Sequence, residues 1–266
     1  MIGSIDCTHW EWKKCLTAWK GQYQGRSGKA TLILEAVASE DLWIWHAFFG
    51  MPGSYNDINV LHRSPVFDDI LEGRVPASNF VVNGNHYDKA YYLPDGIYPQ
   101  WATFIQSITL PQTPKEKLFA KHQEAARKDV ERAFGVLQAR FAIIRKPSLA
   151  WNRDIICKIM VACIIMHNMI VEDERDTYDG YDNPQEFVED NSAKKPQRRA
   201  SKTGRRKKLS RLYVEQDGDF EFSSERIVDI NTYLANKDDV ADKNTHLLLK
   251  SDLVENIWQL YGGTDM

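Results

Sequence analysis

Two neighbouring runs of β-branched and aromatic residues constrain the fold of this chain most. Residues 31–38 read TLILEAVA and residues 42–49 read LWIWHAFF, and both compositions favour β-strands. Only residues 39–41 separate them, which suits a tight turn and predicts a β-hairpin. Shorter runs predict further strands at residues 1–6, 79–83 and 89–93.

From residue 115 onward the pattern changes to that of helices. Residues 115–141 predict one helix, because Val130, Phe134, Leu137 and Phe141 recur at spacings of three and four. Residues 152–173 are apolar nearly all round, which predicts a buried helix. Strands followed by long helices favour an α/β domain with a mixed sheet flanked by helices. Further helices are predicted from Asn56 or Asp57 to Arg63 and across Leu249, Leu253, Ile257 and Leu260, where Gly262 and Gly263 end the helix.

The charges of the chain nearly balance, with 34 Lys+Arg against 37 Asp+Glu. This balance excludes a uniformly basic polyanion binder, but it leaves room for local clusters of charge. Four scattered cysteines exclude a disulfide scaffold, and the first residues do not form a signal peptide. The longest uninterrupted apolar run, residues 159–166, is far shorter than the roughly 20 residues that span a bilayer, so we expect no membrane segment.

Beyond residue 172 the charges separate into two blocks. Residues 172–190 hold nine acidic residues and one basic residue, and residues 194–208 hold nine basic residues and no acidic one. Neither block has an apolar period, so both are predicted to be flexible. We therefore expect a domain over residues 1–172, a flexible segment over 173–225 and a helical segment over 226–266.

Residues 21–30 (GQYQGRSGKA) resemble a nucleotide-binding P-loop only in part. Tyr23 stands where that motif needs its first Gly, and Ala30 replaces the Ser or Thr that would bind magnesium. We interpret the segment instead as a Gly-rich loop whose Lys and Arg side chains suit a phosphate.

Three carboxylates lie where a catalytic site can form. Asp6 ends a predicted strand, Asp95 follows another, and Glu131 borders the buried stripe of a predicted helix. Converging carboxylates repel one another unless cations neutralise them, and oxygen ligands select Mg²⁺ or Mn²⁺. The same residues also have ordinary explanations, because Asp95 fits a Pro-Asp-Gly turn and Glu131 can pair with Arg127 one helical turn earlier.

Several motifs in one order resemble the plant branch of the PIF/Harbinger transposases and their domesticated, antagonist-of-Polycomb-like relatives. They are SIDCTHWEWKKC at 4–15, LILEAVASEDLWIWHAFFGMPGSYNDINVL at 32–61, YYLPDGIYPQWATF at 91–104, ARKDVERAFGVLQARFAIIRKP at 126–147, ACIIMHNMIVEDE at 162–174 and SDLVENIWQLYG at 251–262. The resemblance implies an RNase H-like nuclease fold. It also implies that Asp6, Asp95 and Glu131 form an Asp-Asp-Glu site for two Mg²⁺ or Mn²⁺ ions, with Asp57 as a supporting residue or alternative ligand.

The function that this resemblance implies is metal-dependent cleavage and strand transfer of DNA in the nucleus. The alternative is a catalytically silent, domesticated nuclear protein that acts through protein partners in chromatin regulation. Relatives often carry an upstream DNA-binding region and work with a Myb/SANT-like DNA-binding protein, so we expect such a partner here; the oligomeric state stays open. The expected phosphate contacts are Arg127, Lys128, Arg132, Arg140, Arg145 and Lys146. The expected nuclear-localisation signal or DNA tether comprises Lys194, Lys195, Arg198, Arg199, Arg205, Arg206, Lys207 and Lys208.

Overall fold

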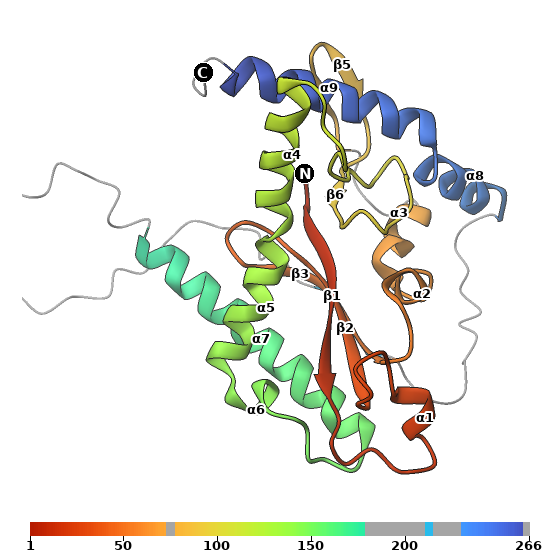
Figure 1. The fold of residues 1–266 in the computed structure, drawn as a ribbon, viewed down its shortest axis with the longest axis vertical. Helices are drawn as coiled ribbons and strands as arrows, with labels where there is room; N and C mark the ends of the chain where they lie inside the picture. The colour runs from red at the N-terminus through yellow and green to blue at the C-terminus, as the bar shows by residue number, and fades with distance from the viewer. Residues whose placement is uncertain (73–77, 179–210, 215–229, 263–266) are drawn as a thin grey trace, which may run out of the picture.

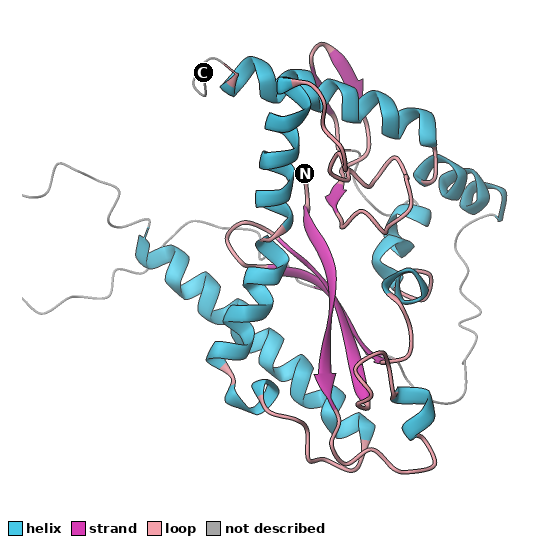
Figure 2. Cartoon of the chain, in the orientation of Figure 1, coloured by secondary structure: helices cyan, strands magenta, loops and turns pink. Residues whose placement is uncertain are grey.

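The computed structural model describes residues 1–72, 78–178, 211–214 and 230–262, and it has a mixed α/β architecture (Figure 1). A five-stranded mixed sheet lies at its centre, with helices on both faces (Figure 2). The strands are β1 (Gly3–Glu11), β2 (Thr31–Ala38), β3 (Ile44–Pro52), β4 (Phe80–Val82), β5 (Asn85–Tyr87), β6 (Tyr92–Leu93) and β7 (Arg211–Val214). The helices are α1 (Lys20–Tyr23), α2 (Asp57–Leu61), η1 (Pro65–Phe67), α3 (Asp68–Leu71), α4 (Pro114–Arg127), α5 (Asp129–Arg140), α6 (Ala142–Arg145), α7 (Arg153–Tyr178), α8 (Ile230–Val240) and α9 (Lys243–Tyr261).

The sheet has the order β6-β1-β2-β3-β7. Strands β1, β2 and β3 are antiparallel neighbours, which confirms the predicted hairpin of β2 and β3. Strand β6 runs parallel to β1 but pairs only with Gly3 and Ser4. In the described part of the chain, the edge of β1 beyond Ser4 is therefore left unpaired as far as Glu11, where Ser148 donates its N–H to the Glu11 carbonyl.

Strand β2 is the centre of the core, and all eight of its residues are buried. Such burial on both faces explains why this strand reads as an apolar run without alternation. Helices α5 and α7 cover one face of the sheet, and α2, η1 and the segment around Phe104 cover the other. Tyr92 also forms a parallel bridge with Phe104, so a further extended segment lies beside β6.

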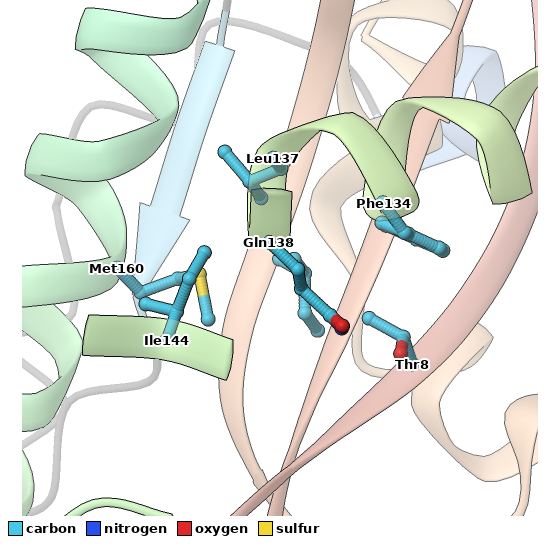
Figure 3. Close-up of a pocket in the computed structure, with 7 residues that line it drawn as sticks. Thr8, Phe134, Leu137, Gln138, Ile144 and Met160 are labelled. Carbon is cyan, nitrogen blue, oxygen red and sulfur yellow. The ribbon is translucent and has the colours of Figure 1, made fainter. Parts of the chain in front are cut away.

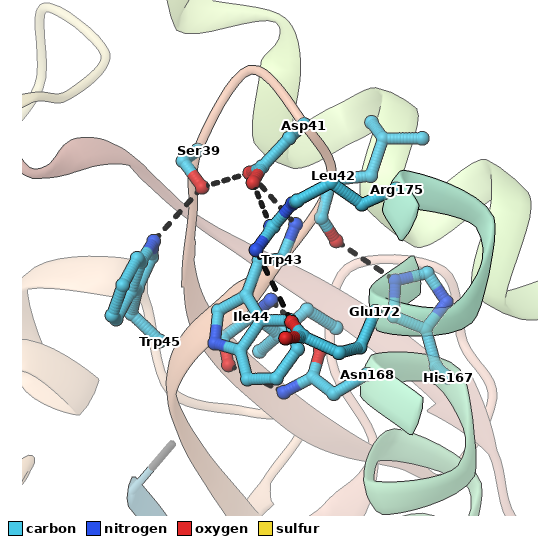
Figure 4. Close-up of polar contacts among 10 residues, drawn as sticks. All are labelled: Ser39, Asp41, Leu42, Trp43, Ile44, Trp45, His167, Asn168, Glu172 and Arg175. Carbon is cyan, nitrogen blue, oxygen red and sulfur yellow. Dashed lines mark hydrogen bonds and ion pairs between the residues drawn. The ribbon is translucent and has the colours of Figure 1, made fainter. Parts of the chain in front are cut away.

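Helix α7 is fastened to the turn between β2 and β3 by polar contacts (Figure 4). Asn168 accepts a hydrogen bond from the Ile44 N–H and donates one to the Ile44 carbonyl, at 3.0 and 2.8 Å. His167 lies 2.8 Å from the Leu42 carbonyl, and burial lowers the pKa of its imidazole. Leu42 has a φ of 67°, a strained value that these contacts hold in place.

By length and composition alone, the Arg153–Arg175 part of α7 could cross a membrane. A core helix meets the same criterion, and Ile156, Met160 and Ile164 of α7 are buried against the sheet. The helix continues to Tyr178, beyond the end predicted at Asp173.

The predicted helix over 115–141 is two helices in the structure. Helix α4 ends at Arg127 and α5 begins at Asp129, with Lys128 between them. The Val130 N–H, which a continuous helix would have bonded internally, instead donates to the Ser4 hydroxyl of β1 at 2.9 Å. This contact between distant segments explains the break, and it brings the start of α5 beside the strand that carries Asp6.

The C-terminal helices pack on the upper end of the molecule (Figure 1). Lys115 of α4 pairs with Glu255 of α9 at 2.6 Å, and Asp252 accepts hydrogen bonds from Asn85 and Tyr87 of the β4–β5 hairpin. Leu249 is buried as predicted, whereas Leu260 is exposed, so the apolar face of α9 is shorter than we expected.

The boundaries predicted at residues 172 and 225 stay predictions, because 179–210 and 215–229 lie outside the described residues. Residues 211–214 form β7 parallel to β3, although they belong to the segment predicted to be flexible.

Candidate carboxylate site

Asp6 lies on β1, just past the point where β6 stops pairing. Its carboxylate accepts a hydrogen bond from the Cys7 N–H at 2.8 Å. The pKa of Asp6 is raised from 3.8 to about 6, mainly by burial and to a smaller extent by the negative charges of Asp57 and Glu131. That hydrogen bond and the charge of Arg127 act in the opposite direction. Asp6 therefore lies close enough to two other carboxylates to feel their charge.

Asp57 is the first residue of α2, on the opposite face of the sheet from α5. Asn56 is the N-cap, with its side chain accepting from the Asn59 N–H at 2.8 Å, so Asp57 is not needed for capping. Burial raises the pKa of Asp57, and the charge of Asp95 adds to this effect. A hydrogen bond with the Cys7 side chain lowers it.

Asp95 follows β6, the strand parallel to β1. Its carboxylate accepts a hydrogen bond from the Ile97 N–H at 3.0 Å, and its carbonyl accepts from the Tyr98 N–H at 3.3 Å. These local contacts are those of a turn residue, which is the ordinary explanation that the Pro-Asp-Gly sequence offered for Asp95. Because its charge also raises the pKa of Asp57, Asp95 nevertheless belongs to the same electrostatic cluster.

Glu131 lies in the first turn of α5 and is half-exposed. Arg127 donates to its carboxylate at 2.9 Å, which is the helical pair that we considered as the alternative to a catalytic role. The side chain borders the buried Val130 as expected, but it lies further toward solvent than the pattern predicted.

Four carboxylates therefore interact electrostatically near the unpaired edge of β1: Asp6, Asp57, Asp95 and Glu131. Within the described ranges, the structure brings no three acidic, His or Cys side chains close enough to hold a metal ion as they stand. The chemistry of the four carboxylates nevertheless fits a divalent cation, since all are hard oxygen donors and a cation would relieve their mutual repulsion. In the structure the Glu131 carboxylate is instead paired with Arg127.

Glu35 is a member of this region that the sequence reasoning did not single out. It lies opposite Cys7 in the β1–β2 register and is fully buried. His46 Nε2 lies 3.5 Å from its carboxylate, which has no hydrogen-bond partner among the residues that the structure describes. Burial raises the pKa values of Cys7 and Tyr98, and the negative charge of Glu35 adds to this effect. A lone carboxylate inside an apolar run, as in TLILEAVA, was the available signal.

The predicted phosphate contacts fall into two groups. Arg127 at the end of α4 pairs with Glu131 of α5, Arg132 pairs with Asp129 within α5, and Arg140 pairs with Glu174. In the described part of the chain, no carboxylate pairs with the other three, which are exposed: Lys128, Arg145 and Lys146. The predicted basic tether, Lys194 to Lys208, lies outside the described residues.

A small cavity lies between the sheet and helices α5, α6 and α7 (Figure 3). Its volume is about 10 Å³, and its lining is mostly apolar, including Leu34, Phe134 and Met160. A cavity of that size holds about one water molecule, so it is packing space and not a substrate site.

Comparisons with known proteins agree on one family. The family model described as "Plant transposon protein" matches residues 1–178. "Protein ALP1-like" of Arabidopsis thaliana is 26% identical over 155 residues, which cover 56% of this chain and 37% of that protein. HARBI1, named as a nuclease, is 24% identical in the human form and 23% in the rat form over 180 residues, or 67% of this chain and 48% of each relative. This chain thus spans less than half the length of these relatives, and no solved structure matches it.

Proposed function

The chain belongs to the plant transposon protein family of Harbinger-like, transposase-derived proteins, and from this premise we propose that it is a metal-dependent DNA nuclease with an RNase H-like fold. The observation that carries the proposal is the cluster of four carboxylates around the free edge of β1, where mutual repulsion helps to raise the pKa of Asp6 to about 6. The fold assignment is supported by three antiparallel strands followed by β6 parallel to β1, with Asp6 on β1 and Asp95 shortly after β6.

In the proposed site, Asp6 and Glu131 hold Mg²⁺ or Mn²⁺ together with Asp95, Asp57 or both. When bound, the cations supply neutralisation of the carboxylates and a water of lowered pKa. In the proposed reaction the water oxygen adds to phosphorus, the bond to the 3′ oxygen breaks, and that oxygen takes up a proton. The products are a 3′-hydroxyl and a 5′-phosphate.

Arg127 has a specific part in this proposal. In the structure it neutralises Glu131 at 2.9 Å. When Glu131 turns toward the other carboxylates, the guanidinium is released beside the site and can donate two parallel hydrogen bonds to a phosphate. In this proposal Arg127 neutralises Glu131 while no cation is bound, and it contacts the DNA phosphate, as expected, when the cation is bound.

A nicking assay on supercoiled DNA with Mg²⁺ or Mn²⁺ tests the proposal. We expect the wild-type chain to nick, and we expect Asp6→Asn and Glu131→Gln to lower the rate at least a hundredfold. Asp57→Asn and Asp95→Asn, compared in the same assay, identify the second ligand. Glu124→Gln is the matched control, because Glu124 is exposed on α4, outside the cluster.

The assay includes a Myb/SANT-like DNA-binding protein, because the resemblance to Harbinger-type proteins leads us to expect such a partner. No metal-dependent nicking by the wild type with that partner present would refute the proposal.

The second candidate function is the catalytically silent nuclear protein that acts through chromatin partners. The Arg127–Glu131 pair favours it, because a site that does not bind cations would keep that pair closed. Isothermal titration with Mn²⁺ separates the two functions. Binding that Glu131→Gln abolishes supports the nuclease, and absence of binding supports the silent protein.

A further inference from the structure

We propose that one end of the sheet, away from the carboxylate site, binds single-stranded DNA by stacking bases on two exposed tryptophans among basic side chains. This surface, which we call the basic pole, consists of residues 13–29 and 145–151. It includes α1 and the connection between α6 and α7 at the lower end of Figure 1. The proposal rests on the proposed function only for the identity of the nucleic acid.

The two segments of the basic pole are held together by direct contacts. The Lys13 N–H donates to the Ser148 carbonyl at 3.0 Å, and the buried Trp12 donates its indole N–H to the Ala150 carbonyl at 2.8 Å. Tyr23 packs edge-on against Trp12, at 5.1 Å between ring centroids. These anchors fix the position of the surface although its segments lie far apart in the sequence.

The charge of the basic pole has one sign. Its two segments contain no Asp or Glu. The nearby Glu11 pairs with Lys29 at 2.8 Å, and so offsets one of the cations. The remaining positive charge fits a polyanion. Seven exposed cations belong to the pole: Lys13, Lys14, Lys20, Arg26, Lys29, Arg145 and Lys146.

Two aromatic side chains at the basic pole are exposed to an unusual degree. Trp151 is 61% exposed, with Lys14 Nζ lying 4.8 Å from the centroid of its ring. Trp19 is 43% exposed and lies 6.2 Å from Trp12, which supports it from behind. Leaving indole rings in water is unfavourable unless a ligand covers them. Rings surrounded by cations suit nucleobases linked by phosphates.

The exposed rings favour single-stranded over duplex DNA. In a duplex the base faces are stacked on one another and only phosphates and groove edges are accessible, so exposed indoles would gain little. An unpaired strand offers both its phosphates and its base faces. Trp12 directly follows β1 and is six residues beyond Asp6, or about 20 Å at 3.3 Å per residue. A strand leaving the carboxylate site therefore reaches the pole within roughly six nucleotides.

Quenching of intrinsic tryptophan fluorescence by oligo(dT), measured on the full chain in EDTA, tests this proposal. EDTA prevents metal-dependent cleavage, so the result does not depend on whether the nuclease proposal holds. The basic run at 194–208 contains no Trp, so binding there does not quench directly. We expect strong quenching in the wild type. Trp19→Leu combined with Trp151→Leu should lose most of it and bind about tenfold or more weakly, since stacking contributes about 1–3 kcal/mol per base.

Matched variants separate stacking from charge. Tyr261→Leu, an exposed aromatic on α9, should behave as wild type. Lys14→Ala and Arg145→Ala should each lower the slope of log affinity against log salt by about 0.7, and Lys117→Ala on α4 should not. Trp151→Leu alone, at the more exposed position, provides the test if the double variant is unfolded by circular dichroism.

Three outcomes would overturn the inference: binding without quenching, duplex binding that is tighter than oligo(dT) binding and unaffected by the Trp variants, or quenching by anionic lipid vesicles with none by oligo(dT).

Discussion

Replacing Asp6 by Asn measures how much repulsion the carboxylate site imposes on the folded protein. The pKa of Asp6 is raised from 3.8 to about 6, first by burial and then by the charges of Asp57 and Glu131. One pKa unit corresponds to about 1.4 kcal/mol, so ionised Asp6 lowers the free energy of unfolding by up to about 3 kcal/mol. The amide carries no charge and can still accept the Cys7 hydrogen bond.

A carboxyl whose pKa is raised on folding binds its proton more tightly in the folded state. Its contribution to stability is complete below about pH 4 and is lost as the pH rises through about 6. The Asp6→Asn variant lacks this titration. We therefore expect its free energy of unfolding to exceed that of the wild type by up to about 3 kcal/mol above pH 7, and the excess to shrink toward zero near pH 3.

Urea unfolding in the presence of a chelator, repeated across this pH range, provides the assay. The quantity to compare is how the difference in free energy of unfolding between Asp6→Asn and the wild type changes with pH. Any effect of the substitution that does not depend on pH cancels in this comparison. Glu124→Gln, at an exposed position of α4, should follow the wild type at every pH. A difference for Asp6→Asn that does not vary with pH, or a variant that becomes less stable toward neutral pH, would refute the reasoning.

Three further predictions concern the cation and the scaffold. Adding Mg²⁺ at neutral pH should raise the melting temperature of the wild type and leave that of the Asp6→Asn variant unchanged; equal shifts in both proteins would show that the cation binds elsewhere. Asn168→Ala leaves the Ile44 N–H and carbonyl without their side-chain partner and should lower the free energy of unfolding by about 2–4 kcal/mol in urea, whereas a loss below about 1 kcal/mol would contradict their pairing. Gly53→Ala would place a Cβ 1.9 Å from the Thr31 hydroxyl and 2.8 Å from its carbonyl, so we expect a loss above about 2 kcal/mol; Gly21→Ala, with no atom within 4 Å, should change stability by less than about 1 kcal/mol in the same experiment.

The hairpin of β2 and β3 could be read from the sequence because its signals are local. Residues 31–38 form β2 with the predicted bounds, while β3 begins at Ile44 and continues to Pro52, beyond the predicted end. A helix start at Asn56 or Asp57 was predicted for the same reason, since a capping side chain that bonds three residues ahead needs no distant partner. The structure has Asn56 as the N-cap.

For the candidate site, the sequence could indicate which residues belong to it but not how they are arranged. Local motifs pointed to Asp6, Asp95 and Glu131, and their catalytic role remains a prediction. Three features of the site depend instead on how elements from different parts of the chain meet. They are the pairing of Glu131 with Arg127, the electrostatic contact of Asp57 with Asp95 and the burial of Glu35.

By itself, the sequence determined the type of each main element and the family, because the hydrophobic period, the helix caps and the family motifs each depend only on residues that are close together in the sequence. The tertiary structure decided where the predicted long helix breaks, because the Val130 N–H finds Ser4 more than 120 residues away. It also decided that Trp19 and Trp151 share one basic surface, because Trp12 joins residues 13–29 to residues 145–151. Contacts between such distant segments depend on the packing of the whole sheet, and no local pattern encodes them.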